Sequence, residues 1–275
     1  MQSLESIVEE EGTIFSDNEI FTLEYVPDEY EYRDSQLQTM ATHSSSIKRG
    51  IRPSTFLLRG GCATGKTTAM IKFFKELETH FPNVVTAHVN CQLYQTEFKV
   101  LSEIHKAIFG HEMKITGRSS DELYHNIMNY LLKEDEILVI GLDDFNFIKG
   151  LNNTLYRLLR AHESYRGVQV GICAITSEVN ELRLKPIVST VFLPVEINFP
   201  KYDRDQIYDI LKKRCDVGFY PGVINEKVID KVVELTFRNG DLRYGIDLLK
   251  NIGEIAESEG STKIIVKHFS KAMNN

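Results

Sequence analysis

The chain has 275 residues, of which 42% are hydrophobic and 26% are charged, and its formal net charge is −7. This is the composition of an ordinary globular protein with a sizeable core, and the acidic balance argues against a surface that is basic throughout. The sequence shows neither the run of ~20 apolar residues that crosses a bilayer nor the basic-then-apolar build of a signal peptide, so we expect a cytoplasmic protein without membrane contact. Four scattered cysteines without C-x-x-C spacing indicate neither a zinc site nor a disulfide framework.

The predicted elements begin after an N-terminal segment over residues 1–50, which has acidic patches and ends in a polar, turn-like stretch. Short apolar runs then alternate with helical patterns and predict strands at Thr55–Leu58, Val84–Val89, Ile137–Leu142, Val168–Ile175 and Val195–Phe199. Ser119 and Glu122 predict a capping box at the start of one helix. The alternation predicts an α/β fold, in which helices cover both faces of a mostly parallel sheet.

A phosphate-binding loop is predicted between the first strand and the amphipathic pattern that follows it, where Gly60 to Thr67 fit G-x-x-x-x-G-K-[ST]. The glycines allow backbone N–H groups to turn inward around phosphate oxygens, and the next helix directs its positive end at the anion. Lys66 supplies charge to the β- and γ-phosphates, and Thr67 offers a hydroxyl to Mg²⁺. The expected phosphate-binding residues are Gly61, Cys62, Ala63, Thr64, Gly65, Lys66, Thr67 and Thr68.

The second part of a nucleotide site is predicted at the end of the third strand, where an apolar run leads into Asp143 and Asp144. A P-loop NTPase needs a carboxylate opposite its loop to hold the Mg²⁺ shell through water, and we assign this role to Asp143. Asp144 stands where a Glu usually polarises the attacking water, and its side chain is one methylene shorter. An acidic pair after a strand also caps helices, but the preceding P-loop favours the nucleotide interpretation.

The strand pattern stops after Pro200. Helical patterns then predict helices at Arg204–Arg214, Asn225–Phe237, Leu242–Glu257 and Val266–Met273. We therefore predict two domains, an α/β nucleotide-binding domain over residues 1–200, which includes the N-terminal segment, and a small all-helical domain over residues 201–275.

An ordered set of motifs accompanies the P-loop, namely Ile14–Phe15, Tyr25–Glu29, Arg33–Leu37, Val89–Cys91, Leu142–Asn146, Leu158–Glu163, Phe199–Asp203 and Gly240–Leu249. In this order the set resembles the archaeal replication initiators, which are AAA+ ATPases related to the eukaryotic origin recognition complex and its loading factor. The resemblance runs from about residue 14 to about residue 272. It implies an AAA+ fold whose helical domain is a lid over the nucleotide.

The resemblance also implies roles for individual residues, with ATP or ADP and Mg²⁺ as cofactors. The residues expected near the adenine or elsewhere on the nucleotide are Tyr25, Val26, Pro27, Arg33 and Tyr208. Ser177 falls where the family usually has an Asn that positions the water. Arg243 matches the second sensor, an Arg of the lid that reaches the γ-phosphate and makes closure depend on nucleotide charge. Without the motif, Arg243 reads as a solvated helix residue that pairs with Asp241 or Asp247.

Four positions depart from the family pattern. Asp144 replaces a Glu, Asn146 an acidic residue, Ser177 an Asn, and Ile187 the Arg that acts across subunits. Each change weakens water activation or activation between subunits. We therefore expect tight nucleotide binding with slow or negligible hydrolysis, and the catalytic assignments rest on Asp144, Ser177 and Arg243.

The expected partners are double-stranded origin DNA, the replicative helicase and other initiator subunits, on a chromosome-associated protein. Family members usually continue into a DNA-binding winged-helix domain, whereas this chain stops at Asn275, as a fragment or a shortened member. DNA contact then depends on residues 98–117, which match a helical insertion that touches duplex DNA. Basic side chains in and beside this region are Lys99, Lys106, Lys114 and Arg118, and a weaker set is Lys48, Arg49 and Arg52. Scattered lysines of this kind are equally consistent with a solvated helix surface.

Three functions remain open from the sequence. The first is an ATP-switched replication initiator, in which nucleotide occupancy is read by partners as shape. The second is a small-molecule kinase, which shares the P-loop but does not explain the long helical region after Pro200. The third is a nucleotide-locked interaction protein without useful catalysis, which the four departures favour.

Overall fold

The computed structural model describes residues 14–22, 25–110, 117–177 and 184–274. The chain forms two compact units. One consists of residues 33–61 and 65–200, and the other consists of the chain up to Tyr32, residues 62–64 and residues from Lys201 onward. We call them the sheet unit and the helical unit, and each is described by itself.

The sheet unit contains five parallel strands in the order β2-β3-β4-β1-β5. They span Phe56–Arg59 (β1), Val84–Asn90 (β2), Ile137–Asp143 (β3), Gln169–Thr176 (β4) and Val195–Asn198 (β5). Every predicted strand is present, with ends that differ by no more than one residue. Because all strands are parallel, their carboxyl ends meet at one edge of the sheet, where open α/β sheets bind ligands.

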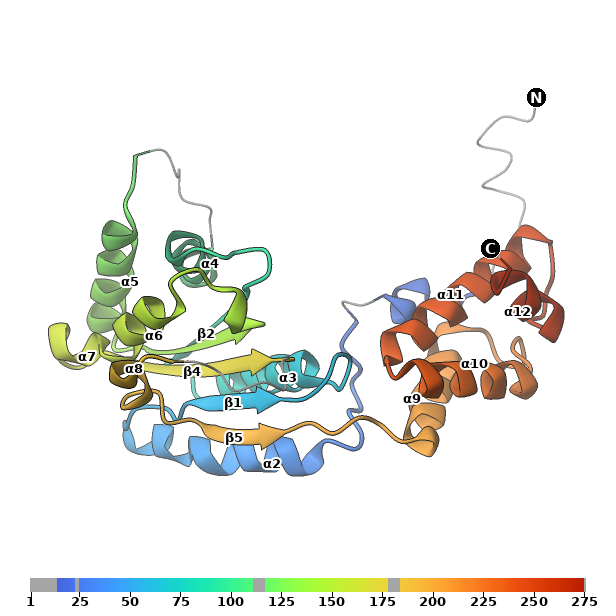
Figure 1. The fold of residues 1–275 in the computed structure, drawn as a ribbon, viewed down its shortest axis with the longest axis horizontal. Coiled ribbons are helices and arrows are strands. Elements are labelled where there is room, and N and C mark those ends of the chain that lie inside the picture. Colours follow the sequence, from blue (N-terminus) through green and yellow to red (C-terminus); the bar gives the residue numbers. More distant parts are fainter. Residues whose placement is uncertain (1–13, 23–24, 111–116, 178–183, 275) are drawn as a thin grey trace. The chain divides into compact units, whose positions relative to one another are not determined.

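Helices cover both faces of this sheet, as Figure 1 shows. The helices are Asp34–His43 (α2), Lys66–His80 (α3), Glu97–Phe109 (α4), Ser120–Glu134 (α5), Leu151–Leu159 (α6), Ala161–Ser164 (α7) and Pro186–Ser189 (α8), with 3-10 turns at Ser44–Arg49 and Phe145–Phe147. A further 3-10 turn, Asn18–Phe21, belongs to the helical unit. A core of buried side chains joins the sheet to α4, α5 and α6. On the opposite face the ring of Phe73 from α3 lies 5.7 Å from that of Phe56. The predicted two-sided α/β architecture is confirmed.

The capping box predicted at Ser119 is only half formed. The Ser119 hydroxyl accepts a hydrogen bond from the Glu122 amide at 3.1 Å and caps α5. The Glu122 carboxylate instead lies 3.5 Å from the guanidinium of Arg118. An exposed cation one turn away therefore competes with the backbone for this carboxylate.

The helical unit contains the four predicted helices, at Arg204–Gly218 (α9), Glu226–Asn239 (α10), Leu242–Ser258 (α11) and Val266–Ala272 (α12). Asp203 and Gln206 form a reciprocal capping box at the start of α9. This helix continues past its predicted end at Arg214, because Cys215 and Gly218 are buried in the core of the unit.

The N-terminal segment groups with the helical unit up to Tyr32, whereas the sequence-based division assigned it to the α/β domain. Its side chains Ile14, Phe15, Ile20 and Phe21 are 3–5% exposed and belong to the same core cluster as α9 to α11. The apolar pattern of the segment shows that it is buried, but its partner helix lies about two hundred residues away in sequence, beyond the range of pattern reasoning. Among the helices within the described ranges, none is long and apolar enough to span a membrane.

Candidate nucleotide-binding site

The loop between β1 and α3 has the backbone shape that a phosphate-binding loop needs. Gly65 adopts φ 89° and ψ 9° immediately before α3, and Ala63 also has a positive φ, of 53°. Turns of this kind in close succession direct backbone N–H groups to one side and form a concave anion site. Since α3 begins at Lys66, the positive end of its dipole adds to the same site.

Lys66 is held at this loop although it carries a charge. Its side chain is 5% exposed, and its ammonium donates hydrogen bonds to the carbonyl oxygens of Gly60 at 2.8 Å and Gly61 at 2.6 Å. A buried ammonium requires such partners, because desolvation without them is costly. The carbonyl oxygens of the loop thus fix the position of the Lys66 ammonium.

A direct hydrogen bond joins the first turn of α3 to the end of β3. The Thr67 hydroxyl donates to the Oδ2 atom of Asp143 at 2.7 Å. The same oxygen lies 3.7 Å from Nε2 of His88, which β2 contributes opposite Gly141. Two hard oxygen ligands side by side suit Mg²⁺, so the residues assigned to the metal fit it. The sequence did not predict His88 here, because only the strand pairing brings it to Asp143.

Asp144 is held by two side chains and by its backbone conformation. Its φ and ψ are 51° and 47°, in the left-handed region that Asp tolerates better than most residues. Oδ2 accepts a hydrogen bond from Nε2 of Gln92 at 2.7 Å, and Oδ1 accepts one from the Ser177 hydroxyl at 3.4 Å. Burial raises the pKa of the Asp144 carboxyl, as does Asp143, while Gln92, Lys66 and Ser177 oppose the rise. Asp144 and Ser177, predicted from separate motifs, are in contact.

Gln92 was missed by the sequence analysis. The backbone N–H of Gln92 donates to Oδ1 of Asn90 at 3.0 Å, and the backbone carbonyl of Gln92 accepts from the side chain of Gln95 at 2.9 Å. The turn after β2 therefore fixes the position of Gln92. One signal in the sequence could have identified Gln92, because it belongs to a polar cluster directly after β2. Since β2 and β3 are parallel neighbours, their carboxyl ends lie at the same edge of the sheet.

Asn146 joins the ends of two strands at the same edge. Its Oδ1 accepts a hydrogen bond from the Thr176 hydroxyl at 3.3 Å. Ile187, which occupies the position of the trans-acting Arg, is 56% exposed on α8.

Three residues of the helical unit that we assigned to the nucleotide contact side chains of the same unit. The ring of Tyr25 lies under the guanidinium of Arg214, 4.6 Å from its centroid. The Tyr208 hydroxyl donates to the Glu226 carboxylate, and this bond raises the pKa of Tyr208 to about 12. Arg243, at the start of α11, is about half exposed, and its Nε atom lies 3.8 Å from Asp241.

Arg33 has a different environment from the other predicted adenine neighbours. It is 2% exposed, and its guanidinium donates to the Pro200 carbonyl at 2.7 Å and lies 5.9 Å from the centroid of the Phe199 ring. Val26 and Pro27 are partly exposed in the helical unit. The sheet unit therefore brings together Lys66, Thr67, Asp143, Asp144 and Ser177 with the loop glycines Gly61 and Gly65. The helical unit contains Tyr25, Val26, Pro27, Tyr208 and Arg243.

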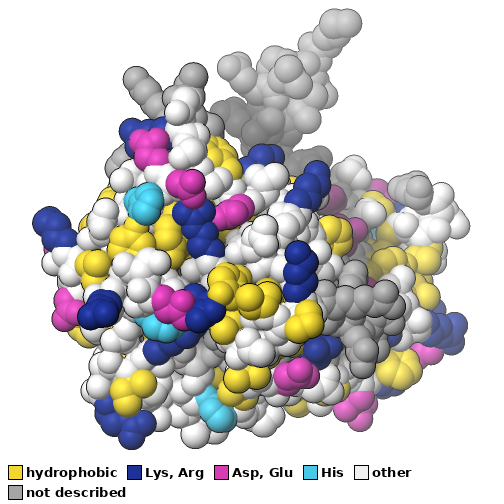
Figure 2. All heavy atoms as spheres, turned by 60° about the vertical axis from the view of Figure 1, so that its left-hand side comes forward, with side chains coloured by type: hydrophobic (Ala, Val, Ile, Leu, Met, Phe, Trp, Pro, Cys, Tyr) yellow, Lys and Arg dark blue, Asp and Glu magenta, His cyan; other side chains and the backbone are white. Residues whose placement is uncertain are grey.

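The predicted DNA-contacting side chains are scattered. Lys99 and Lys106 are exposed on α4, Lys114 lies outside the described residues, and Arg118 pairs with Glu122. Of the weaker set, Lys48 and Arg49 are exposed, whereas the Nε atom of Arg52 donates to the Val170 carbonyl at 3.0 Å. On the face in Figure 2, Lys and Arg side chains alternate with Asp and Glu.

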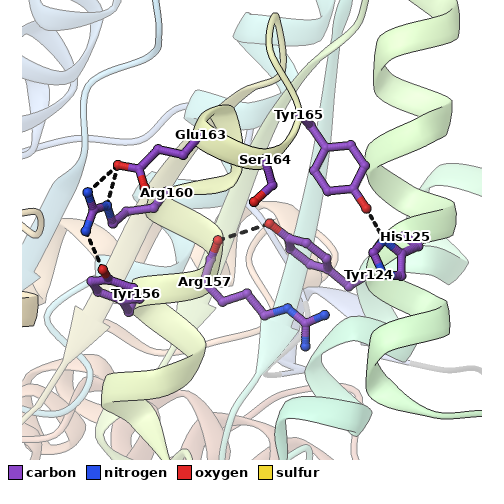
Figure 3. Close-up of a pocket in the computed structure, with 8 residues that line it drawn as sticks. All are labelled: Tyr124, His125, Tyr156, Arg157, Arg160, Glu163, Ser164 and Tyr165. Atoms are coloured by element: carbon purple, nitrogen blue, oxygen red, sulfur yellow. Dashed lines mark hydrogen bonds and ion pairs between the residues drawn. The ribbon is translucent and has the colours of Figure 1, made fainter.

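A pocket of about 570 Å³ lies among α5, α6 and α7, and Figure 3 shows its lining. Arg157 pairs there with Glu97 at 2.9 Å and Asp121 at 2.7 Å, and Arg160 pairs with Glu163. Both guanidinium groups are thus neutralised by carboxylates. Tyr165, in the lining, stands just before the amino end of β4, whereas the P-loop follows the carboxyl end of β1, so this pocket and the candidate site lie at opposite edges of the sheet.

Comparisons with known proteins identify the family. Residues 208–274 match the family described as the Cdc6 AAA+ ATPase-type lid domain. The ORC1-type DNA replication protein 2 of Methanothermobacter thermautotrophicus is 39% identical over 278 residues, covering 100% of this chain and 73% of that protein. The protein of the same description from Methanosarcina mazei is 40% identical over 264 residues, covering 94% and 71%. The chain belongs to the ORC1-type DNA replication protein family.

Solved structures of this family show the same fold. The structure of Aeropyrum pernix ORC1 in complex with DNA matches with a TM-score of 0.85 and 31% identity, over 96% of this chain and 70% of that one. ORC2 of the same organism, solved as ADPNP–ADP complexes, matches with a TM-score of 0.83 over 94% and 72% at 22% identity, which shows the fold alone. The predicted AAA+ fold with a helical lid and the predicted replication-initiator family are confirmed, which argues against the small-molecule kinase.

Proposed function

We propose that this ORC1-type chain binds ATP and ADP with Mg²⁺ and acts as a slowly hydrolysing conformational switch in replication initiation. The observation that carries the proposal is the connected set at the carboxyl edge of the sheet, in which Thr67 contacts Asp143 and Ser177 contacts Asp144 beside the P-loop lysine. In P-loop NTPases these are the phosphate-binding and metal-binding parts.

The residues of the sheet unit fit the proposed cofactors. Lys66 and the loop amides would bind the phosphates, and Thr67 with Asp143 would hold Mg²⁺, which supplies charge neutralisation at the phosphate oxygens when bound. On the nucleotide's other parts we assign Tyr25, Val26, Pro27 and Tyr208 to the base side and Arg243 to the γ-phosphate. We assign Arg33 a supporting role through the Pro200 carbonyl.

Slow hydrolysis follows from the state of Asp144. Both of its oxygens already accept hydrogen bonds, so a water molecule must compete with Gln92 and Ser177 for the carboxylate. Its side chain is also short for reaching a water molecule. A nucleotide that is bound tightly and hydrolysed slowly keeps each state long enough for partners to read it.

Nucleotide binding and single-turnover hydrolysis test the proposal on the whole chain. We expect ADP and ATP to bind in the presence of Mg²⁺, with hydrolysis far slower than dissociation, and Lys66→Ala to abolish binding. Fast turnover that depends on Lys66 would contradict the switch, and binding of neither nucleotide would contradict the site itself. ADP that never exchanges would instead support the nucleotide-locked interaction protein, which the engaged Asp144 and the apolar Ile187 also favour.

We further propose that the protein binds duplex origin DNA and acts with other initiator subunits and the replicative helicase. The family and the DNA complex of Aeropyrum pernix ORC1 support DNA binding, and the exposed Lys99 and Lys106 supply phosphate contacts. Duplex binding by the whole chain should weaken as salt rises. Lys99→Glu with Lys106→Glu should lower the affinity and the salt slope, and an unchanged slope would remove α4 from the interface.

A further inference from the structure

The N-terminal segment follows one side of α9 in antiparallel direction. Along the chain from Tyr220 back to Asp209, the contacts join Tyr220 to Ile14, Gly218 to Ser16 and Asp17, Arg214 to Ile20 and Tyr25, Lys213 to Glu29 and Glu31, and Asp209 to Tyr32. As the residue number falls along the helix, it rises along the segment. The order of the pairs shows that the described residues of the segment contact α9 at several successive points.

The first part of this track is fixed by packing. The rings of Phe15 and Phe21 lie 5.0 and 4.7 Å from the ring of Phe219, measured between centroids. Gly218 leaves the space that this requires, since a Cβ atom on it would lie 2.3 Å from the Phe21 ring. Contacts this close leave no room for the segment to slide along the helix.

The second part is fixed by charged side chains of α9. The Arg214 guanidinium donates to the carbonyl oxygen of Ile20, lies 3.5 Å from that of Tyr25 and is 4.6 Å from the centroid of the Tyr25 ring. Lys213 contacts Glu29 at 2.6 Å and Glu31 at 2.5 Å. The residues proposed to meet the base, Tyr25 to Pro27, stand between these two anchors in the sequence.

We infer that Arg214 and Lys213 are positioning residues for the nucleotide base, because they set the place of Tyr25–Pro27 on the helical unit. Neither residue needs to touch the nucleotide for this role. The inference rests on the proposed function, in which Tyr25–Pro27 contact the base. The new element of the inference is that base recognition depends on α9. The N-terminal segment then functions together with the helices of the lid.

Comparing ADP with inorganic pyrophosphate tests the inference on the whole chain. Pyrophosphate can use the P-loop but has no base, so Arg214→Ala should weaken ADP binding about tenfold, the equivalent of one hydrogen bond to a charged group, and leave pyrophosphate binding unchanged. Arg214→Lys, which keeps the charge but loses the planar stacking, should fall between. Lys213→Ala should act in the same direction and less strongly, because its ion pairs are exposed.

The matched control is Lys212→Ala, which also removes one positive charge from α9. The Lys212 side chain pairs with Asp216 at 3.0 Å and not with the described residues of the N-terminal segment. It should change neither affinity. If Arg214→Ala does not fold, Arg214→Lys and Lys213→Ala carry the test. Equal losses for ADP and pyrophosphate, or an ADP affinity that no variant changes, would overturn the inference. A wild-type chain that binds pyrophosphate and ADP equally would instead contradict the proposed base contact itself.

Discussion

At the scale of single residues, the proposed slow hydrolysis depends on Asp144. Gln92 and Ser177 occupy its two oxygens, and burial and Asp143 raise its pKa. In the proposed function, the hydrogen bonds that hold the carboxylate in place also compete with a water molecule for its two oxygens.

Lengthening this side chain tests whether reach limits hydrolysis. Asp144→Glu adds one methylene, and we expect single-turnover hydrolysis to rise on the order of tenfold, part of the ~10²–10⁴-fold that a positioned general base contributes. Asp144→Asn is the control, since it keeps the size of the side chain and should lose the residual hydrolysis. A Glu variant that binds ADP normally but hydrolyses ATP no faster would show that reach is not limiting.

Gly253 is a second residue whose role depends on its neighbours. A Cβ atom at this position of α11 would lie 2.4 Å from the Phe15 ring and 3.0 Å from the Phe219 ring. Gly253→Ala should therefore destabilise the protein by about 1–3 kcal/mol through overpacking, which outweighs the gain of up to ~1 kcal/mol in helix propensity. Urea unfolding measures the change. In a Phe15→Leu background the cost should shrink, and an equal cost in both backgrounds would remove Phe15 as its cause.

At the scale of elements, α11 and α12 are joined by charges around Glu259. Its carboxylate lies 3.0 Å from the Lys267 ammonium and contacts that of Lys271. The hydrogen bonds to Lys271 and Lys267 lower the pKa of Glu259 from 4.5 to about 2. The carboxyl of Glu259 thus stays ionised in the folded chain at a pH where it is protonated in the unfolded chain.

The sign of this shift gives a pH prediction. A lowered folded-state pKa contributes stability above pH 4.5, and this contribution is lost as the pH falls toward about 2. Wild type should therefore be more stable than Glu259→Gln near neutral pH, and the difference should close over this window in urea unfolding. Burial lowers the pKa of His268 below its ordinary value of 6.5, and Glu259 opposes this shift, so the stability that the neutral imidazole contributes is lost as the pH falls below 6.5. A difference that persists at pH 2 would rule out ionisation as the source.

At the scale of the whole molecule, the residues that we assign to the nucleotide are divided between the two units. The sheet unit contains Lys66, Thr67, Asp143 and Asp144. The helical unit contains Arg243, and α9 in that unit holds the N-terminal segment. A bound nucleotide stabilises the native chain by mass action, since it binds the folded state and not the unfolded one.

Thermal unfolding measures this stabilisation by the nucleotide. At an ADP concentration about 100 times its Kd the native state should gain about 2.7 kcal/mol, which for a chain of this size corresponds to a rise in Tm of several degrees. Lys66→Ala should unfold at the same temperature with and without ADP. A comparable rise in that variant would show that ADP binds elsewhere.

The fold was predictable because its signals are local. The P-loop is contiguous, each strand is a short apolar run, and the four helices after Pro200 have regular apolar patterns, so neighbours in sequence carry the information. The contacts of the P-loop threonine with Asp143 follow from the motif and the parallel sheet together. The positions of Gln92 and His88 and the packing of the N-terminal segment could not be predicted in this way. Each depends on a contact with a segment that is distant in the sequence.

The sequence by itself determined the family, the α/β sheet with its helical lid, and which residues belong to the P-loop and to the acidic strand end. Only the tertiary structure decided that Gln92 and Ser177 hold Asp144, that Arg33 is buried against Pro200, and that the described residues 14–22 and 25–32 run along α9. The physical reason is that pattern and propensity act between near neighbours in the chain, whereas burial and side-chain hydrogen bonds depend on which distant segments pack together.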